Sequence, residues 1–416
     1  MINRLLALFL LASPVFAANW TSWRGPHHDG TCDETGLPLT WSVPDNKNIA
    51  WSVELPGPGN STPVVWEDKV FVTQAVKKEG KRLLLCFDKK SGKKLWEGGL
   101  TYHHPETTHD TNPLCSGSPA TDGERVIVNF ASAGVSCFDL EGKELWHRDL
   151  GQQKHIWGSG TSPVIVGDVV YLNHGPGEFT RLVAMDKKTG KVLWERPEPI
   201  REGDKEGARG YYGSWSDPLP RVINDKPQLL MSWPYYACAI DPATGKDLWK
   251  CDGLNPLVYT SPLLEGDTMI AMGGFSGMAL AVKVGGSGDV TATHRLWHHP
   301  KSPQRIASGA IHEGHIYILN DSGVAQCINV KTGEQVWNER LKGNGPSGQN
   351  WSSIVISEGN CYAVNQVGDA FVFKASPKFE LLAANPMGEK VIGSIAVSDG
   401  RLFIRGYKHL FCVAAK

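Results

Sequence analysis

The sequence predicts an all-β protein, an eight-bladed β-propeller in which each blade has four antiparallel strands. Three observations carry this prediction. A turn phrase that ends in tryptophan recurs along the chain, its copies lie 40 to 55 residues apart, and the two ends of the chain supply complementary fragments of one unit. Units of that size with four short strands are typical of propeller blades, whereas a parallel solenoid uses shorter repeats.

The recurring phrase predicts a β-hairpin that closes on an indole. Its copies include LLCFDKKSGKKLW, SCFDLEGKELW, LVAMDKKTGKVLW, ACAIDPATGKDLW and AQCINVKTGEQVW. The apolar run and the segment that ends in tryptophan both alternate with period two, as strands do. The aspartate can accept hydrogen bonds from the turn backbone, and the glycine supplies the left-handed conformation that a short hairpin loop often needs.

A second phrase precedes each copy and predicts two further strands. Examples are STPVVWEDKVFVTQ, TSPVIVGDVVYLNH and GSIAVSDGRLFIRG, in which short apolar runs flank a tight turn. Each unit therefore has four strands, here called A to D from the channel outward. The units close at these positions: Trp51, Trp96, Trp146, Trp194, Trp249, Trp297, Trp337 and Leu382.

The two ends of the chain are expected to complete one blade together. The last unit, SIAVSDGRLFIRGYKHLFCVAAK, supplies strands A to C and then stops, whereas Trp51 lies in NIAWSVEL, a lone strand D. Pairing of the segment around Trp51 with the segment around Phe411 closes the ring and removes two open sheet edges. The propeller is therefore expected to span residues 37–416.

A small residue is expected to make room for each tryptophan, because protein interiors are densely packed. In the seventh unit both positions change, with Val372 in place of the small residue and Leu382 in place of the tryptophan. The chain has nine cysteines, an odd number, and those at this position are expected to be unpaired core residues. The small residues are Cys86, Cys137, Ala184, Ala239, Ala281, Cys327 and Cys412.

The N-terminus predicts export. Residues 1–17 combine Arg4, a short apolar run and small residues before a cleavage site, as a secretory signal peptide does, and no cysteine follows for a lipid anchor. Residues 18–36 form an N-terminal arm, in which Trp20, Trp23 and Arg24 are expected to anchor against a blade. We expect a secreted or periplasmic protein, monomeric and without a membrane span.

The net charge of −1, without long runs of either sign, argues against nucleic acid or an anionic membrane as the main partner.

The turn phrase resembles the pyrroloquinoline-quinone-like (PQQ-like) repeat, roughly Ala-x-Asp-x-x-Thr-Gly-x-x-x-Trp. The opening NWTSWRGPHHDG, with THDTNPLCSGSP and GLNPLVYTSP, is similar to a large group of secreted bacterial repeat proteins. The resemblance implies the fold of quinoprotein alcohol dehydrogenases. That fold also serves a periplasmic lipoprotein that assists outer-membrane barrel assembly, so the fold alone does not choose between an enzyme and a binding protein.

Candidate site residues are expected on the face that carries the D-to-A and B-to-C loops, because the A-to-B and C-to-D turns on the other face are tight. Side chains just before the A strands would converge on the channel mouth, where aromatic rings with amide, imidazole and guanidinium groups suit a planar or sugar-like ligand. The alternative is that these aromatic residues pack on each other over the blades. The candidates are His155, Trp157, Tyr211, Tyr212, Trp215, Tyr259, Arg305, Gln349, Asn350 and Trp351.

One D-to-A loop, GGLTYHHPETTHDTNPLC, groups four residues that can ligate metal: His103, His104, His109 and Asp110. Their spacing matches no closed structural zinc motif. The alternative is a polar loop that forms hydrogen bonds to neighbouring blades.

Two functions from different classes remain open. The favoured one is a non-catalytic propeller, without a resident cofactor, that binds a protein, peptide or polysaccharide partner on the D-to-A loop face. The alternative is a redox enzyme with its site at the channel mouth, either one that uses pyrroloquinoline quinone with calcium or one with other redox chemistry. The sequence has no adjacent cysteine pair, no Cys-x-x-Cys-His haem motif and no Gly-x-Ser-x-Gly nucleophile motif, so binding is favoured.

Overall fold

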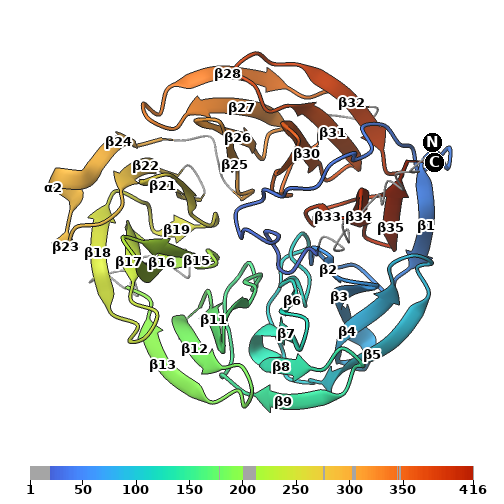
Figure 1. Ribbon diagram of the computed structural model, residues 1–416. Coiled ribbons are helices and arrows are strands. Elements are labelled where there is room, and N and C mark those ends of the chain that lie inside the picture. The colour runs from blue at the N-terminus through green and yellow to red at the C-terminus, as the bar shows by residue number, and fades with distance from the viewer. Residues whose placement is uncertain are drawn as a thin grey trace, which may run out of the picture.

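Eight antiparallel sheets stand around a central channel in the computed structural model, which confirms the predicted propeller (Figure 1). The structure describes residues 19–177, 179–199, 212–274, 277–301, 306–343, 345 and 348–415. The predicted signal peptide, residues 1–17, lies outside these ranges. Within them, no helix is both long enough and apolar enough to cross a membrane.

The strands follow the order A to D in every blade. Blades 1 to 4 contain β2 (Val64–Trp66), β3 (Lys69–Val76), β4 (Lys81–Asp88), β5 (Lys94–Thr101); β6 (Ala120–Thr121), β7 (Val126–Asn129), β8 (Val135–Phe138), β9 (Glu144–Arg148); β10 (Val164–Val166), β11 (Val169–His174), β12 (Arg181–Asp186), β13 (Val192–Pro197); and β15 (Leu219–Ile223), β16 (Lys226–Trp233), β17 (Tyr236–Ile240), β18 (Asp247–Asp252).

Blades 5 to 8 contain β20 (Leu263–Glu265), β21 (Thr268–Met272), β22 (Ala279–Lys283), β24 (Arg295–His299); β25 (Ala310–His312), β26 (His315–Leu319), β27 (Val324–Asn329), β28 (Gln335–Arg340); β29 (Val355–Ser357), β30 (Asn360–Val364), β31 (Asp369–Lys374), β32 (Leu381–Pro386); and β33 (Ala396–Ser398), β34 (Arg401–Arg405), β35 (His409–Ala414), β1 (Ile49–Glu54). The remaining elements are β14 (Gly213–Ser214), β19 (Leu257–Val258), β23 (Gly288–Asp289), α2 (Thr291–His294), η1 (Lys77–Glu79) and η2 (Ala131–Ala133).

The eighth blade is built from both ends of the chain, as predicted. Strand β1 pairs antiparallel with β35, with Trp51 opposite Cys412 and Ser52 opposite Phe411. Figure 1 shows β1 and β35 side by side in this blade. The N-terminal strand is therefore the outer strand D of the last blade.

The register confirms the predicted pairing of a small residue with each tryptophan and corrects one position. In the seventh blade Val372 lies opposite Ala383 and not opposite Leu382, because the C-to-D turn is one residue longer there: Phe373 pairs with Leu381, whereas Phe87 pairs with Lys94 in blade 1. The volumes still compensate, since a larger residue faces a smaller one. The remaining pairs are Cys412–Trp51, Cys86–Trp96, Cys137–Trp146, Ala184–Trp194, Ala239–Trp249, Ala281–Trp297 and Cys327–Trp337.

All nine cysteines are free, and those at the small-residue position are buried, as expected for core residues.

Most of these tryptophans also join their blade to the next one. The indole N–H of Trp146, for example, donates to the carbonyl of Lys187 in the C-to-D turn of the following blade, at 2.9 Å. The contact requires a glycine in that turn, because a Cβ on Gly190 would lie 2.5 Å from the Trp146 ring. The equivalent bonds run from Trp51, Trp96, Trp194, Trp297 and Trp337 to the carbonyls of Lys89, Leu140, Pro242, Val330 and Ser376.

Trp249 is the exception, because its N–H is buried and has no partner among the described residues. The next blade has Lys283 in place of the turn aspartate, followed by an insertion. That insertion adds β23 in parallel beside β18 and so covers the outer edge of blade 4. The edge is protected there by backbone pairing.

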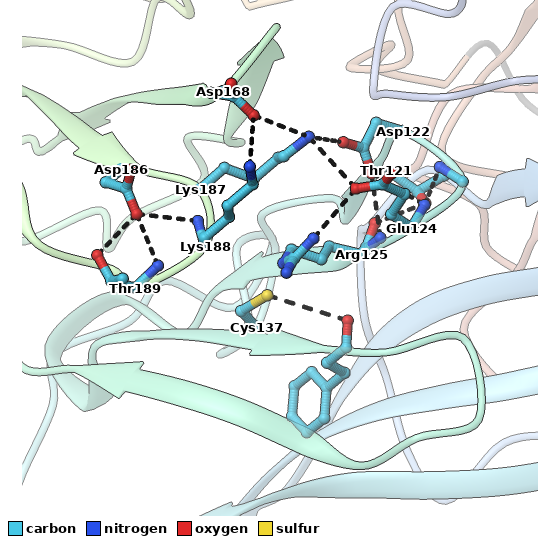
Figure 2. Close-up of polar contacts among 12 residues, drawn as sticks. Thr121, Asp122, Glu124, Arg125, Cys137, Asp168, Asp186, Lys187, Lys188 and Thr189 are labelled. Atoms are coloured by element: carbon cyan, nitrogen blue, oxygen red, sulfur yellow. Dashed lines mark hydrogen bonds and ion pairs between the residues drawn. The ribbon is translucent and has the colours of Figure 1, made fainter.

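Ion pairs reinforce the contact between neighbouring blades on the side of the tight turns. Figure 2 shows Lys187, from the C-to-D turn of blade 3, extending to Asp122 in the A-to-B turn of blade 2. The Nζ–Oδ2 distance is 2.5 Å, and the Lys187 side chain is only 8% exposed. Lys89 bonds to Asp399 in the same way across the junction of blades 1 and 8.

The turn aspartate acts as predicted. Asp186 Oδ1 accepts hydrogen bonds from the backbone N–H and the hydroxyl of Thr189, at 2.8 and 2.7 Å. Figure 2 shows this contact beside Lys187. The aspartate therefore shapes the loop that receives the tryptophan of the preceding blade.

A second set of contacts joins the blades around the channel. Two residues before each strand A, a backbone N–H donates to the side chain at the same position of the next blade. The bonds are 2.9 to 3.1 Å long and run Thr62 to Ser118, Ser118 to Ser162, Ser162 to Asp217, Asp217 to Ser261, Ser261 to Ser308, Ser308 to Ser353 and Ser353 to Ser394. We call these eight residues the hydroxyl belt.

Asp217 is the one carboxyl group of the belt. Burial raises the pKa of Asp217 well above its usual range, although hydrogen bonds from Ser162 oppose this effect. The neutral acid is thereby favoured, and it occupies the position that a serine hydroxyl holds in the neighbouring blades. The belt is open at one place, because the buried Thr62 hydroxyl has no partner among the described residues.

The N-terminal arm anchors as predicted and crosses the channel. Trp20 pairs with Val65 of blade 1, and Thr31 bridges to Ile356 of blade 7. Between them Arg24 is 4% exposed and donates to the carbonyls of Ile354, Gly309 and Asp29. Burial lowers the pKa of Arg24 to about 10, with the charge of Asp29 opposing this, so the guanidinium stays charged at neutral pH.

We expect the indole N–H of Trp146 to stabilise the ring. Replacing it by sulfur, by incorporating benzothienylalanine, should lower the free energy of unfolding by about 1 kcal/mol, since one hydrogen bond is lost at nearly constant volume. The same replacement at Trp249, whose N–H has no partner in the described part of the chain, should change the free energy of unfolding little. Denaturant unfolding of both variants measures the difference, and equal losses at the two positions would contradict the assignment.

The Lys187–Asp122 pair predicts acid-sensitive stability. Burial opposes ionisation of Asp122, but the hydrogen bonds from Lys187 and from two turn N–H groups outweigh it and lower the pKa of Asp122. Such a carboxyl stabilises the fold above its unfolded pKa of about 3.9, and this contribution is lost as the pH falls through the lower folded pKa. Lys187→Met should therefore lower stability at neutral pH and reduce its further loss in acid.

Lys188→Met is the matched control, because Lys188 is 59% exposed beside the buried Lys187. Urea unfolding of both variants from neutral to acid pH measures the effect. Identical pH profiles for the two variants would show that the buried pair contributes nothing.

Arg24→Met should release the N-terminal arm. The substitution removes all the guanidinium donors from three carbonyl groups, and the expected loss in the free energy of unfolding is at least about 2 kcal/mol. Limited proteolysis should then cut the arm before the blades. Asp33→Asn is the control within the same arm, because the Asp33 side chain is 97% exposed; equal protection of both variants would refute the anchoring role.

Candidate functional site

A cavity of about 380 Å³ opens at the channel mouth, on the face of the D-to-A loops. The loops before strand A of all eight blades contribute to its lining. Trp23 of the N-terminal arm lies at its base, and the Arg24 guanidinium lies 5.6 Å from the Trp23 ring. The arm therefore gives the channel a floor.

An aromatic wall forms the side of the cavity at blades 3 to 5. The rings of Trp215 and Tyr259 are 4.9 Å apart and nearly perpendicular, and Trp157 lies 6.2 Å from each. The Trp215 N–H donates to the Gly158 carbonyl at 3.0 Å. His155 packs edge-on against Trp215 at 4.8 Å and is 6% exposed, so it supports this wall from behind.

The opposite side of the cavity, at blades 7, 8, 1 and 2, carries neutral polar groups beside Trp351, Ile392 and the His109 ring. The belt hydroxyls of Ser353, Ser394 and Ser118 reach its surface, together with Asn60 and the exposed Gln349. The Asn60 amide donates to the Thr111 carbonyl at 2.8 Å, whereas its buried Oδ1 has no hydrogen-bond partner among the described residues. This side therefore has unused hydrogen-bonding capacity.

The loop with the candidate metal ligands bridges the cavity mouth. His109 Nδ1 lies 2.8 Å from the Thr111 hydroxyl, and its ring lies 6.5 Å from Trp351 of blade 7. The Asp110 carbonyl accepts the Tyr407 hydroxyl of blade 8 at 2.9 Å. The Asn112 amide donates to two carbonyls of the loop before blade 3. These contacts hold the loop against neighbouring blades, which agrees with the interpretation of the loop as a polar segment that forms hydrogen bonds to other blades.

The remaining candidate ligands in this loop point elsewhere. His103 lies against Gly80 of blade 1, and the His104 ring is 5.2 Å from Tyr102. Across the described residues, no group of three His, Cys, Asp or Glu side chains is arranged to hold a metal ion.

The structure brings together about half of the candidate ligand-binding residues. Trp157, Trp215, Tyr259, Gln349 and Trp351 line the cavity, and His155 stands behind them. Tyr212 is not part of the lining, and Tyr211 and Arg305 lie outside the described residues.

Asn350 is fully buried and has a structural role. Its amide donates to the carbonyls of Leu319 and Ser352, at 2.7 and 3.1 Å. It therefore fixes the loop before blade 7 and does not face a ligand.

Several lining groups were not among the candidates. Trp23 was expected only to anchor the arm, and Asp321 enters from a B-to-C loop. The belt serines were also missed. A signal for them exists, because a serine or threonine recurs two residues before strand A in seven of the eight blades, with Asp217 in the other.

The cavity is poor in charge over its described lining, where His109 and Asp321 are the titratable side chains and no lysine or arginine occurs. Pyrroloquinoline quinone is a tricarboxylate that binds together with calcium. It would require cationic partners and several oxygen ligands for the metal. The described lining, with a single carboxylate, does not fit this group.

A family model and solved structures of other proteins match this chain. The family model described as outer membrane protein assembly factor BamB matches residues 40–199 and 236–416. Two solved structures share the fold: BamB from Moraxella catarrhalis, with a TM-score of 0.61, 13% identity and coverage of 88% of this chain and 97% of that one, and quinohemoprotein alcohol dehydrogenase from Comamonas testosteroni, with a TM-score of 0.71, 14% identity and coverage of 96% and 81%.

Curated proteins match over shorter stretches. Tetrathionate hydrolase from Acidithiobacillus ferrooxidans is 24% identical over 235 residues, which are 53% of this chain and 42% of that protein. Quinoprotein ethanol dehydrogenase from Pseudomonas aeruginosa is 29% identical over 150 residues, which are 33% and 22%. The matches thus span less than half the length of these relatives. Because the family model covers most of the chain and the ring has eight blades, the chain belongs to the PQQ-like repeat β-propeller family represented by the outer membrane protein assembly factor BamB.

Proposed function

We propose that the chain is a non-catalytic recognition protein that holds its ligand in the cavity of the D-to-A loop face. The observation that carries this proposal is the chemistry of the cavity, which has an aromatic wall facing neutral amides and hydroxyls. Such a lining offers contact area and directional hydrogen bonds. General acid–base or metal chemistry requires paired titratable groups or metal ligands near one point.

The rigidity of the site supports recognition. The Trp215 indole is held by a carbonyl, the loop around His109 is tied to three other blades, and the arm closes the floor. A preformed cavity loses little conformational entropy on binding, so more of the interaction energy appears as affinity. We further propose export through the predicted signal peptide and function as a monomer, with a partner outside the cytoplasm.

Quinone-dependent oxidation is the second candidate. Its support comes from matched relatives, which include the quinoprotein ethanol dehydrogenase and a polyvinylalcohol dehydrogenase from Sphingopyxis that is 24% identical over 197 residues. These residues are 43% of this chain and 28% of that enzyme. For such a reaction, cationic groups outside the described residues would have to complete the site, and Arg305 is one such residue.

Capture experiments test the recognition proposal. Immobilised protein is incubated with extract of the native cell envelope, and bound molecules are identified by mass spectrometry. Trp157→Ala should reduce capture of the specific ligand at least about tenfold, which corresponds to roughly 1.4 kcal/mol of lost contact. Trp66→Ala is the matched control, because this partly buried tryptophan lies at the A-to-B turn of blade 1, on the opposite face.

Two outcomes would overturn the proposal. Equal capture by the two variants would show that the cavity is not the binding site. Stoichiometric uptake of pyrroloquinoline quinone with calcium, followed by dye reduction with alcohols or sugars, would establish the redox enzyme instead.

A further inference from the structure

The two sides of the cavity differ in chemistry, and this difference restricts the ligand. In an eight-bladed ring, blade 4 stands opposite blade 8, so the wall of Trp157, Trp215 and Tyr259 faces the side that carries Ser394 and Asn60. A ligand that fills the cavity can therefore place a flat apolar surface on this wall and hydrogen-bonding groups on the other side, where hydroxyls and amides lie beside Trp351 and Ile392.

The polar side requires both donors and acceptors from the ligand. Ser118, Ser353 and Ser394 each accept one backbone N–H within the belt, which leaves the O–H hydrogen and a second lone pair of each hydroxyl for a ligand. The buried Asn60 Oδ1 lacks a donor among the described residues. The serine hydroxyls, rather than this buried oxygen, are therefore the groups that this side offers to a ligand.

The charge of the site favours a neutral ligand. The described lining has no lysine or arginine to pair with an anion, and Asp321 is its only carboxylate. The buried Arg24, whose guanidinium lies 5.6 Å from the Trp23 ring, is engaged by three carbonyls. An anionic ligand would lose hydration here without gaining an ion pair from the described lining, because its one carboxylate, Asp321, attracts only cations.

We infer that the cavity binds a neutral sugar unit, with one face of the pyranose ring on the aromatic wall and its hydroxyl groups on the belt side. This inference rests on the proposed recognition function and specifies its ligand. A sugar ring has C–H groups on its face and hydroxyls at its edge, and each hydroxyl is both donor and acceptor. A neutral sugar therefore matches the aromatic wall, the hydroxyl and amide groups, and the lack of lysine or arginine in the described lining.

Titration with neutral hexasaccharides tests the inference. Hexamers of glucose, mannose, galactose, xylose and N-acetylglucosamine are added to the full chain at millimolar concentrations and followed by calorimetry and native mass spectrometry. At least one hexamer should bind with an affinity that is independent of salt, because no charge pair is formed. A hexamer of galacturonate, which is charged, should bind at least about tenfold more weakly.

Variants locate the binding. Trp157→Ala should weaken it at least about tenfold, and Trp157→Phe should restore part of it, because a ring for stacking returns. Gln349→Ala should weaken it less, with Gln335→Ala on the outer strand of blade 6 as its exposed matched control. Trp66→Ala should bind as the parent chain does. A further titration uses the monosaccharide of whichever hexamer binds. It distinguishes recognition of a single sugar unit from recognition of an oligosaccharide.

The outcomes separate the two proposals. If no neutral saccharide binds but a peptide or protein is captured through Trp157, the sugar inference is wrong and the recognition function stands. If a saccharide binds and Trp157→Ala leaves its affinity unchanged, the cavity is not the site and both proposals fail. Tighter binding of the galacturonate hexamer would overturn the assignment of a neutral ligand.

Discussion

The geometry of the ring depends on contacts between blades, because strand pairing within the described residues joins neighbouring blades only at blades 4 and 5, through β18 with β23 and β14 with β19. Two sets of contacts act at different radii. At the channel, the hydroxyl belt links the positions that precede the A strands, and at the rim the tryptophan N–H groups and lysine side chains reach into the next blade. Because these contacts hold neighbouring blades together both at the channel and at the rim, they also set the width of the channel mouth and the shape of its cavity.

Sequence reasoning predicted the fold well because its signals are local and repeated. Period-two alternation and the Asp-to-Gly turns define strands and hairpins, and eight copies leave little freedom in the count. The one misplaced element, Leu382, reflects a C-to-D turn that is one residue longer in blade 7, since alternation alone does not show which of two neighbours, Leu382 or Ala383, opposes Val372.

The site was less predictable, because the path of a long loop decides where its side chains point. Trp157 and Trp215 line the cavity. Asn350 comes from the same kind of loop, but its amide donates hydrogen bonds to backbone carbonyls. The belt serines carry a periodic signal but look like ordinary turn residues in one sequence. Trp23 became part of the cavity only because Arg24 holds the arm across the channel, a contact with residues far away along the chain.

The pairing of β1 with β35 has a consequence for how the protein is made. The first strand of the ring has no partner in its blade until the C-terminal strand is available, so blade 8 cannot be completed before that strand is in place. Until then β1 and β35 each present an unpaired edge to any neighbouring chain, and incomplete molecules are open to aggregation. Unfinished molecules therefore need to stay apart until β35 is available. A truncation that removes only β35 leaves β1 and β34 without their partner strand, so the ring stays open even if the other blades form.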